Sequence, residues 1–446
     1  MHDALLEGSA KPVWAGLSPR IGLSKLRSMR RLSISYVRNA IGLSPSIFLA
    51  VFVAGAARHM PALPQRQSPK VFAKEFESLL KELDRGSPFF DVKGISRDWK
   101  KAKAELRSRV KKCNSEADFF DLVVEAGRRL RDGHFQITKA DVEKNEFPKS
   151  WWPGISMLPA TENRVVVMGV PRSMSGVLEV GDVITKIDGK SARDVLDGRA
   201  ADDWERGGYF SSPQRARFFA YRTALMTEEQ NAKFDLEWID SEGKKKRRSV
   251  RAEYEPRGWQ HEYNMPEGLE AAAKSVHFTK IGTTGYIYFR RLDATAEAGF
   301  AKAVAALSGV SAWIVDLRGN TGGGYDRSFV DRLSELEKGS RKVAVLIDGG
   351  CISAGETMAR DLVRHAKASL YGQTTAGSSS TKKLLDLLDG KIQVRYSNAS
   401  RKGIKRDIEF YGIEPDVIVE ANPDELRAGK NSMIEYALRE LADSKK

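Results

Sequence analysis

Apolar positions along the chain change their spacing twice, which divides it into three regions. Over residues 69–148 they recur at the three- and four-residue intervals of a helix face, as in Phe72, Phe76, Leu79 and Leu80. We therefore expect a small N-terminal helical bundle over residues 69–148.

Residues 151–256 carry short runs typical of strands instead. Val165–Val170 is rich in β-branched residues, and two further runs, Phe234–Ile239 and Ser249–Tyr254, flank a Ser-Glu-Gly turn. The pattern predicts a compact β-rich domain with one or two helices.

From residue 270 to residue 446, apolar runs alternate with helical patterns. This order favours a largely parallel sheet covered by helices, which is an α/β fold. The expected strands are Gly285–Phe289, Ala312–Leu317 and Val343–Ile347, and the expected helices are Ala294–Leu307, Tyr325–Leu336 and Ala354–His365.

The N-terminus has the pattern of an export signal. Basic residues precede an apolar run, Ile47–Ala57, which is short for a membrane span but typical of a signal-peptide core, and Ala54-Gly55-Ala56 offers a cleavage site. We expect residues 1–57 to be a signal peptide, residues 58–68 a linker, and the protein to be periplasmic or extracellular. The alternative is an uncleaved anchor, through which alone the protein would contact a membrane.

Composition adds little to this picture. The 446 residues are 41% hydrophobic and 30% charged, and the net charge of +14 is scattered and accompanied by no nucleic-acid-binding motif. Cys113 and Cys351 are the two cysteines, and no histidines or cysteines have the spacing of metal ligands. We expect no nucleic-acid partner and no metal site.

Two strand ends carry candidate chemistry. The first strand runs into Asp-Leu-Arg-Gly-Asn-Thr-Gly-Gly-Gly (residues 316–324), where glycines let backbone N–H groups converge on one point. After the next strand, Ser353 opens a helix, so its hydroxyl lies at the positive end of the helix dipole. The alternative is that Ser353 only caps the helix, with Glu356 as its capping-box partner.

Together these segments resemble the S41 family of tail-specific (C-terminal processing) serine peptidases. Further matching segments are Gly372–Gly377, Gly412–Val417 and, for the PDZ signature of that family, Val180–Gly189. The resemblance implies a crotonase-like α/β core over residues 270–446, a PDZ-like domain over residues 151–256, and Ser353 as the nucleophile.

The resemblance also implies the surroundings of the nucleophile. The N–H groups of Gly322 and Ala354 would form the oxyanion hole, and Gly323 and Thr375 would contact substrate. The substrate would be a polypeptide whose C-terminal tail is taken up by the PDZ-like domain, and no organic cofactor is implied. The oligomeric state stays open.

The general base is the point at which the branches of the family differ. The lysine of the lysine-type branch is replaced here by Ser378, whereas Leu130–Phe135 resembles the Leu-x-Asp-Gly-His segment of the branch that includes tricorn-type cores. This implies His134 as the base. Glu409 would orient His134, directly or through another side chain, and Glu414 is an alternative.

Two other hypotheses remain. A nearby lysine, Lys382 or Lys383, could serve as the base in place of His134. Alternatively, the chain could be an inactive relative that binds peptides or hydrophobic ligands.

Overall fold

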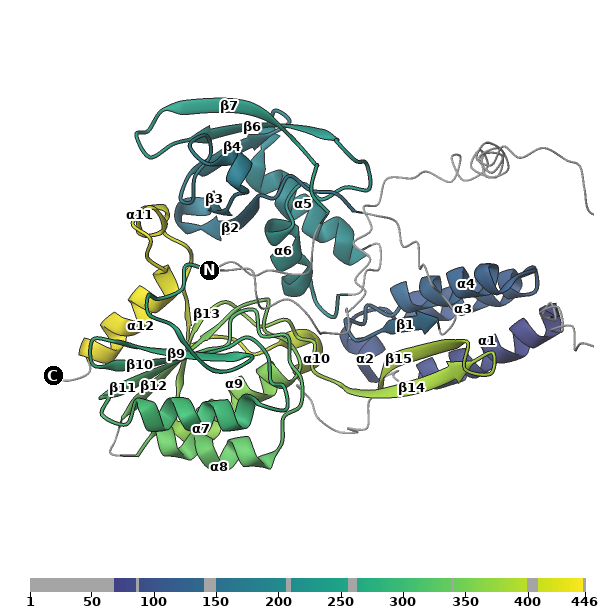
Figure 1. Cartoon of the computed structure of the whole chain (residues 1–446). Coiled ribbons are helices and arrows are strands. Elements are labelled where there is room, and N and C mark those ends of the chain that lie inside the picture. Colours follow the sequence, from purple (N-terminus) through teal and green to yellow (C-terminus); the bar gives the residue numbers. More distant parts are fainter. Residues whose placement is uncertain are drawn as a thin grey trace, which may run out of the picture.

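The structure is a computed structural model that describes residues 68–85, 88–139, 150–205, 210–255, 263–338, 341–398 and 408–443. The expected signal peptide, residues 1–57, lies outside the described residues. Three units are visible, coloured purple to blue, teal, and green to yellow (Figure 1). Within the described part of the chain, no helix has the length and apolarity needed to span a membrane.

The first unit is a helical region that begins as the spacing predicts. Pro69 starts the first helix, whose buried face includes Phe72, Phe76 and Leu79, and Ser115 caps the fourth by accepting a hydrogen bond from Asp118 N–H. The elements are α1 (Pro69–Asp84), α2 (Pro88–Val92), α3 (Ser96–Val110), α4 (Glu116–Arg128) and β1 (Gln136–Lys139).

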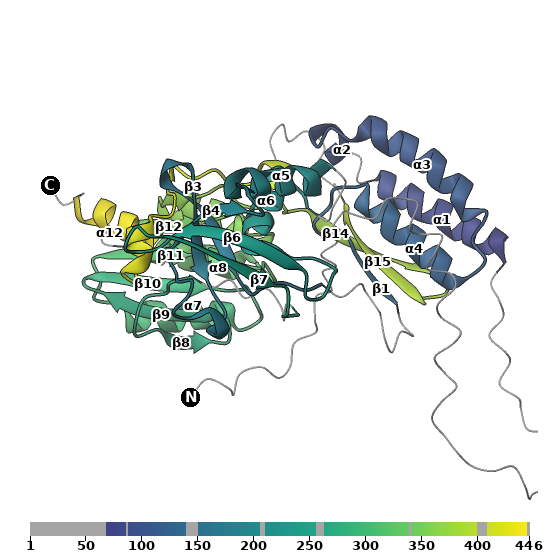
Figure 2. The same cartoon turned by 90° about the horizontal axis from the view of Figure 1, so that it is seen from above.

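This helical region is completed by a hairpin from far along the chain. The strands β14 (Thr381–Leu387) and β15 (Ile392–Asn398) join β1 in an antiparallel sheet of order β1-β15-β14. Leu387, Ile392 and Val394 are buried in the same apolar cluster as the helices. Both views show the hairpin beside α1, α3 and α4 and outside the core sheet (Figures 1 and 2).

The middle module is β-rich with two helices, as the strand pattern predicts. Its sheet has the order β2-β3-β4-β6-β7, and β5 pairs with β4. Two short 3₁₀ turns, Thr161–Asn163 and Arg172–Met174, join its strands. Its other elements are β2 (Ser156–Ala160), β3 (Arg164–Gly169), β4 (Val183–Ile187), β5 (Lys190–Ser191), α5 (Ala192–Glu205), α6 (Pro213–Arg222), β6 (Lys233–Ile239) and β7 (Lys245–Arg251).

The core is a seven-stranded sheet of order β16-β13-β12-β11-β10-β9-β8. The pairs from β16 to β10 are parallel, and β9 and β8 add an antiparallel edge, so the expectation of a largely parallel sheet is confirmed. Its strands are β8 (Glu270–Ala273), β9 (Val276–Ile281), β10 (Thr284–Phe289), β11 (Ala312–Asp316), β12 (Lys342–Ile347), β13 (Ser369–Gly372) and β16 (Val417–Ile418).

Helices cover both faces of this sheet, which explains why β10 and β11 are buried along their whole length. One apolar cluster lies under α7, α8 and α9, and a second lies under α12 (Figure 1). The helices are α7 (Ala296–Ala306), α8 (Arg327–Leu336), α9 (Ala354–Ala366), α10 (Ile408–Tyr411), α11 (Pro423–Arg427) and α12 (Ser432–Asp443).

Replacing Gly127 by alanine tests the packing of the helical region. An added Cβ on Gly127 would lie 2.0 Å from the Phe135 ring. Because the Phe135 ring is itself buried in the apolar cluster and has little room to turn away, we expect the substitution to lower the free energy of unfolding by about 1–3 kcal/mol in urea denaturation. Gly198→Ala in α5 is the matched control, since no atom lies within 4 Å of that position. An equal, small effect of both substitutions would contradict the packing.

Candidate active site

Ser353 lies in a strained turn between β12 and α9. Its backbone has φ 56° and ψ −120°, a region that residues with a side chain rarely adopt. The Ser353 N–H donates to the Ser378 carbonyl (2.8 Å) and to Glu356 Oε2 (3.0 Å). This geometry resembles the strand-to-helix turn on which hydrolases present a nucleophile.

The Ser353 hydroxyl is engaged by a lysine as well as lying at the helix start. Ser353 and Glu356 form a capping box at the N-terminus of α9, in which Glu356 bonds back to the Ser353 N–H. The hydroxyl oxygen also accepts a hydrogen bond from Lys382 Nζ at 2.9 Å. The capping geometry that the sequence suggested is therefore present, and it coexists with a contact to a cation.

Glu356 holds the serine turn against the loop that follows β13. The fully buried carboxylate accepts hydrogen bonds from Thr375 Oγ1 (2.7 Å), Gly377 N–H (2.7 Å) and Ser378 N–H (3.0 Å), besides that from Ser353. Burial raises the pKa of Glu356 to about 7, although these donors favour the charged form. Glu356 therefore positions Ser353.

Thr375, which the resemblance assigned to substrate binding, is part of this frame. Its side chain is fully buried, and its hydroxyl donates to Glu356 and accepts from the Ile413 N–H at 2.7 Å.

The glycine-rich loop comes directly beside Ser353. A Cβ on Gly322 would lie 2.8 Å from the Ser353 Cβ and 3.3 Å from the Ala354 nitrogen, so only glycine fits. The Gly322 N–H donates to Asn320 Oδ1 at 2.9 Å. In the described residues, neither the Gly323 nor the Ala354 N–H has a hydrogen-bond acceptor. The predicted loop therefore lies at the serine, but the Gly322 amide is already in use.

His134 lies in the turn after α4, buried among serines. Its Nδ1 is 3.5 Å from Ser378 Oγ and 3.4 Å from Ser380 Oγ, and its buried Nε2 has no partner among the residues described. Burial, followed by the Lys382 cation, lowers the pKa of His134 to about 3, so the ring is neutral at physiological pH. Within the described part of the chain, no hydrogen bond joins His134 to Ser353.

Asp132 fixes the turn that carries His134. Its Oδ1 accepts hydrogen bonds from the His134 N–H (2.9 Å) and Ser397 Oγ (2.8 Å), and its Oδ2 accepts one from the Ser397 N–H (2.9 Å). Burial opposes ionisation, but the Lys93 charge and these donors hold the pKa of Asp132 below its ordinary value. The helical region is thereby joined to β15.

Glu409 forms a second link between the helical region and the core. Its Oε1 accepts a hydrogen bond from Lys93 Nζ at 2.7 Å, and both side chains are buried. The same ammonium donates to the Arg131 carbonyl at 2.8 Å, and Glu409 Oε2 accepts from the Ser379 N–H at 3.0 Å. Burial raises the pKa of Glu409.

Serine side chains lie between Glu409 and His134. Ser211 is a hydrogen-bond partner of Glu409, its Oγ is 3.2 Å from Ser378 Oγ, and Ser378 Oγ is 3.5 Å from His134 Nδ1. The one hydroxyl proton of Ser211 can be donated to Glu409 or to Ser378 at a time. The orienting role of Glu409 stays a prediction.

Lys382 is the residue whose position the sequence did not predict. It was named only as an alternative base, because its separation from Ser353 differs from that of the lysine-type branch. The hairpin register places it opposite Ser397, while Lys383 pairs with Tyr396 and faces the helices instead. Burial, with a smaller effect of Arg395, lowers the pKa of Lys382.

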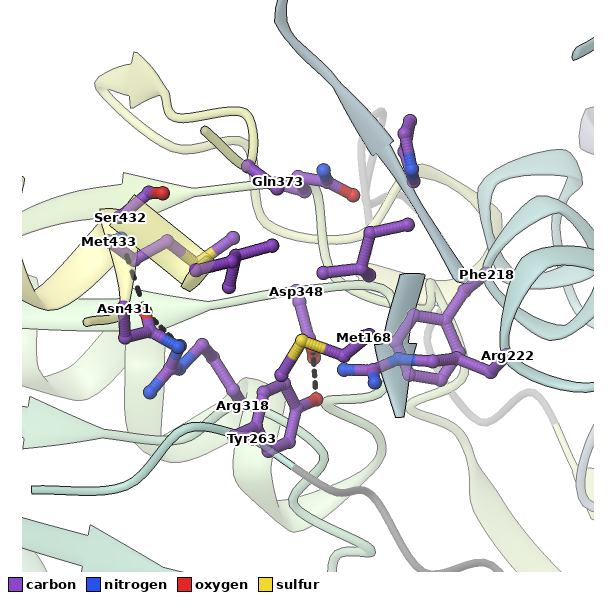
Figure 3. Close-up of a pocket in the computed structure, with 14 residues that line it drawn as sticks. Met168, Phe218, Arg222, Tyr263, Arg318, Asp348, Gln373, Asn431, Ser432 and Met433 are labelled. Carbon is purple, nitrogen blue, oxygen red and sulfur yellow. Dashed lines mark hydrogen bonds between the residues drawn. The ribbon is translucent and has the colours of Figure 1, made fainter. Parts of the chain in front are cut away.

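A separate cavity lies between the middle module and the core, away from Ser353 (Figure 3). Its volume is about 30 Å³, enough for roughly one water molecule. The Tyr263 ring lies between the guanidinium groups of Arg222 and Arg318, and its hydroxyl bonds to Asp348. Asp348 also accepts a hydrogen bond from the Gly350 N–H, three residues before Ser353. This side of the cavity is therefore continuous with the turn that carries Ser353.

The comparisons with known proteins point to one peptidase family. Residues 325–419 match the model of Peptidase family S41, a range that includes Ser353, Thr375 and Glu409. The chain is 26% identical over 163 residues to carboxyl-terminal-processing peptidase 2, chloroplastic, of Arabidopsis thaliana. The alignment covers 30% of this chain and 31% of that protein. It is also 27% identical over 177 residues to a probable CtpA-like serine protease of Staphylococcus epidermidis. That alignment covers 33% of this chain and 35% of the relative.

Similarity also extends to solved structures. The crystal structure of mature CPAF aligns with a TM-score of 0.58 and 13% identity, over 82% of this chain and 95% of the CPAF chain. The structure of mature CPAF complexed with lactacystin aligns with a TM-score of 0.57 and 13% identity, over 84% of this chain and 98% of that chain. At this identity the likeness concerns the fold. The chain spans about a third of the curated relatives that it matches. The match of residues 325–419 to Peptidase family S41 agrees with the prediction from the motifs.

The raised pKa of Glu356 gives a prediction for stability. The unfolded carboxyl loses its proton near pH 4.5 and the folded one near pH 7, so the stabilisation present below pH 4.5 is lost as the pH rises through 7. We expect the free energy of unfolding of the wild type, relative to that of Glu356→Gln, to fall by about 3 kcal/mol between these values in urea denaturation. Parallel curves would mean that folding does not raise the pKa of Glu356.

Proposed function

We propose that this protein is a serine-type endopeptidase in which Ser353 attacks the substrate peptide bond. The observation that carries the proposal is the position of its hydroxyl. It stands on a strained turn at the start of α9, accepts a hydrogen bond from Lys382, and lies beside the glycine-rich loop. A family match over residues 325–419 supports the same chemistry.

His134 is the proposed general base. It is neutral and therefore carries a lone pair, its Nε2 has no partner in the part of the chain described, and it shares Ser378 and Lys382 with the serine site. Hydrogen bonds between catalytic groups are often long before substrate binds, so the missing contact with Ser353 does not argue against this role. Glu409 would orient His134 through Ser211 and Ser378.

The reaction would proceed through an acyl-enzyme. Ser353 Oγ attacks the scissile carbonyl while its proton passes to His134, which then protonates the leaving amine. The Ala354 N–H, with an amide of the glycine-rich loop, stabilises the oxyanion. Water, deprotonated by His134, releases the acid product and restores Ser353.

The finer features that the resemblance implies belong to the same proposal. The core would be crotonase-like, and the middle module would be a PDZ-like domain that binds the C-terminal tail of a polypeptide substrate. The export signal at residues 1–57 would place the enzyme in the periplasm or outside the cell.

Labelling with a fluorophosphonate tests the proposal, using the full chain and folded variants checked by thermal melting. The wild type should label at one site. Ser353→Ala should lose the label, and His134→Ala should label about 10²–10⁴-fold more slowly. Lys382→Met should still label.

Two results would contradict parts of this account. Loss of labelling in Lys382→Met, with labelling retained in His134→Ala, would make Lys382 the base. A folded wild type that neither labels nor cleaves peptides would favour a binding protein, in which Lys382 occupies the Ser353 hydroxyl.

A further inference from the structure

Lys382 is hydrogen-bonded to the proposed nucleophile. Its Nζ donates to Ser353 Oγ at 2.9 Å. An ammonium is a donor only, so this bond uses a lone pair of the oxygen that must attack the substrate. Because a hydrogen bond from a cation withdraws electron density from Oγ, Ser353 becomes a better nucleophile when the ammonium has another acceptor.

No carboxylate among the described residues pairs with this ammonium, because Lys382 forms no salt bridge there. Asp132 and Glu409 attract it from a distance, but Asp132 is bonded to the His134 turn and Ser397, and Glu409 is bonded to Lys93 and Ser379. Arg395 repels it, and the nearby His134 is neutral. Lys382 is thus a cation on an exposed residue, within reach of a ligand and without a counter-ion in the described part of the chain.

The strand beyond Lys382 provides a surface that continues from Ser353. Alternate residues of a strand share a face, so Lys382 and Leu384 lie on the side that also carries Ser397 and Arg395 of β15. Leu384 is 58% exposed. Beside the nucleophile, the sheet therefore presents two cations around one apolar side chain.

We propose that Lys382 determines specificity by binding a substrate carboxylate next to the scissile bond. The carboxylate replaces Ser353 Oγ as the acceptor for Nζ, which makes Oγ a stronger nucleophile. No covalent bond changes in this step. This inference rests on the proposed peptidase function. The carboxylate has two sources, an acidic side chain or the C-terminus of the substrate.

Matched peptides test the inference on the full chain. We would compare internally quenched peptides that carry either Glu or Gln at the positions flanking the cleaved bond. Each peptide would be made with a free and with an amidated C-terminus. The wild type should cleave the carboxylate-bearing peptide with a kcat/KM roughly five-fold higher. Lys382→Met should reduce this ratio to about one, largely through faster cleavage of the neutral peptide, because Ser353 is no longer occupied.

Lys383→Met is the matched control, since Lys383 faces the helices and should keep the wild-type ratio. A difference in kcat/KM between the Glu and Gln peptides would identify an acidic side chain as the source of the carboxylate. A difference between the free and amidated peptides would identify the C-terminus. An unchanged ratio in Lys382→Met would overturn the inference, and so would loss of fluorophosphonate labelling in that variant.

A binding measurement separates this inference from the proposed function. Fluorescence anisotropy of the same peptides on Ser353→Ala, with and without Lys382→Met, requires no turnover. A carboxylate preference that Lys382→Met removes would support the inference even if the wild type cleaves nothing. A preference that persists would overturn it even if the wild type is an active peptidase.

Discussion

The site depends on one buried carboxylate. Glu356 accepts hydrogen bonds from the Ser353 N–H, from Thr375 and from the Gly377 and Ser378 N–H groups, so it joins the serine turn to the loop after β13. A buried carboxylate is tolerated only when its oxygens are this fully bonded. Because the turn at Ser353 is strained, these bonds also hold a conformation that the chain would otherwise leave.

Two further polar links bring the histidine to the serine. Asp132 binds the His134 turn to β15, and Lys93 binds Glu409 across 316 residues of sequence. The Gly133 N–H donates to Ser211 of the middle module at 3.0 Å. All three units therefore contribute to one cluster, in which burial keeps His134 neutral and the Lys382 cation lies on the nucleophile.

Sequence reasoning succeeded where chemistry and geometry are local. The strand, turn and helix around Ser353 lie within some twenty residues, and so do the strand and glycine-rich loop that approach it, and the structure has both. The S41 family was recognised from these segments and is supported by the match over residues 325–419. The roles of Ser353, His134 and Glu409 remain predictions.

What the sequence missed depends on long-range register. Asp389-Gly390, between two runs with apolar residues, is a hairpin signal that could have indicated β14 and β15. Nothing local could show that this hairpin packs on the helical region, or that its register directs Lys382 to Ser353 and Lys383 to the helices. The use of the Gly322 N–H by Asn320 is likewise a tertiary contact.

The most direct test of the central claim is to trap the acyl-enzyme. The full chain would be mixed rapidly with a slowly deacylating ester of a peptide acid, quenched in acid, and digested for mass spectrometry. The account predicts an acyl group on the peptide that contains Ser353, absent from Ser353→Ala and much slower to form in His134→Ala. Hydrolysis of the ester without any acyl group on Ser353, or with the acyl group on Lys382, would contradict it.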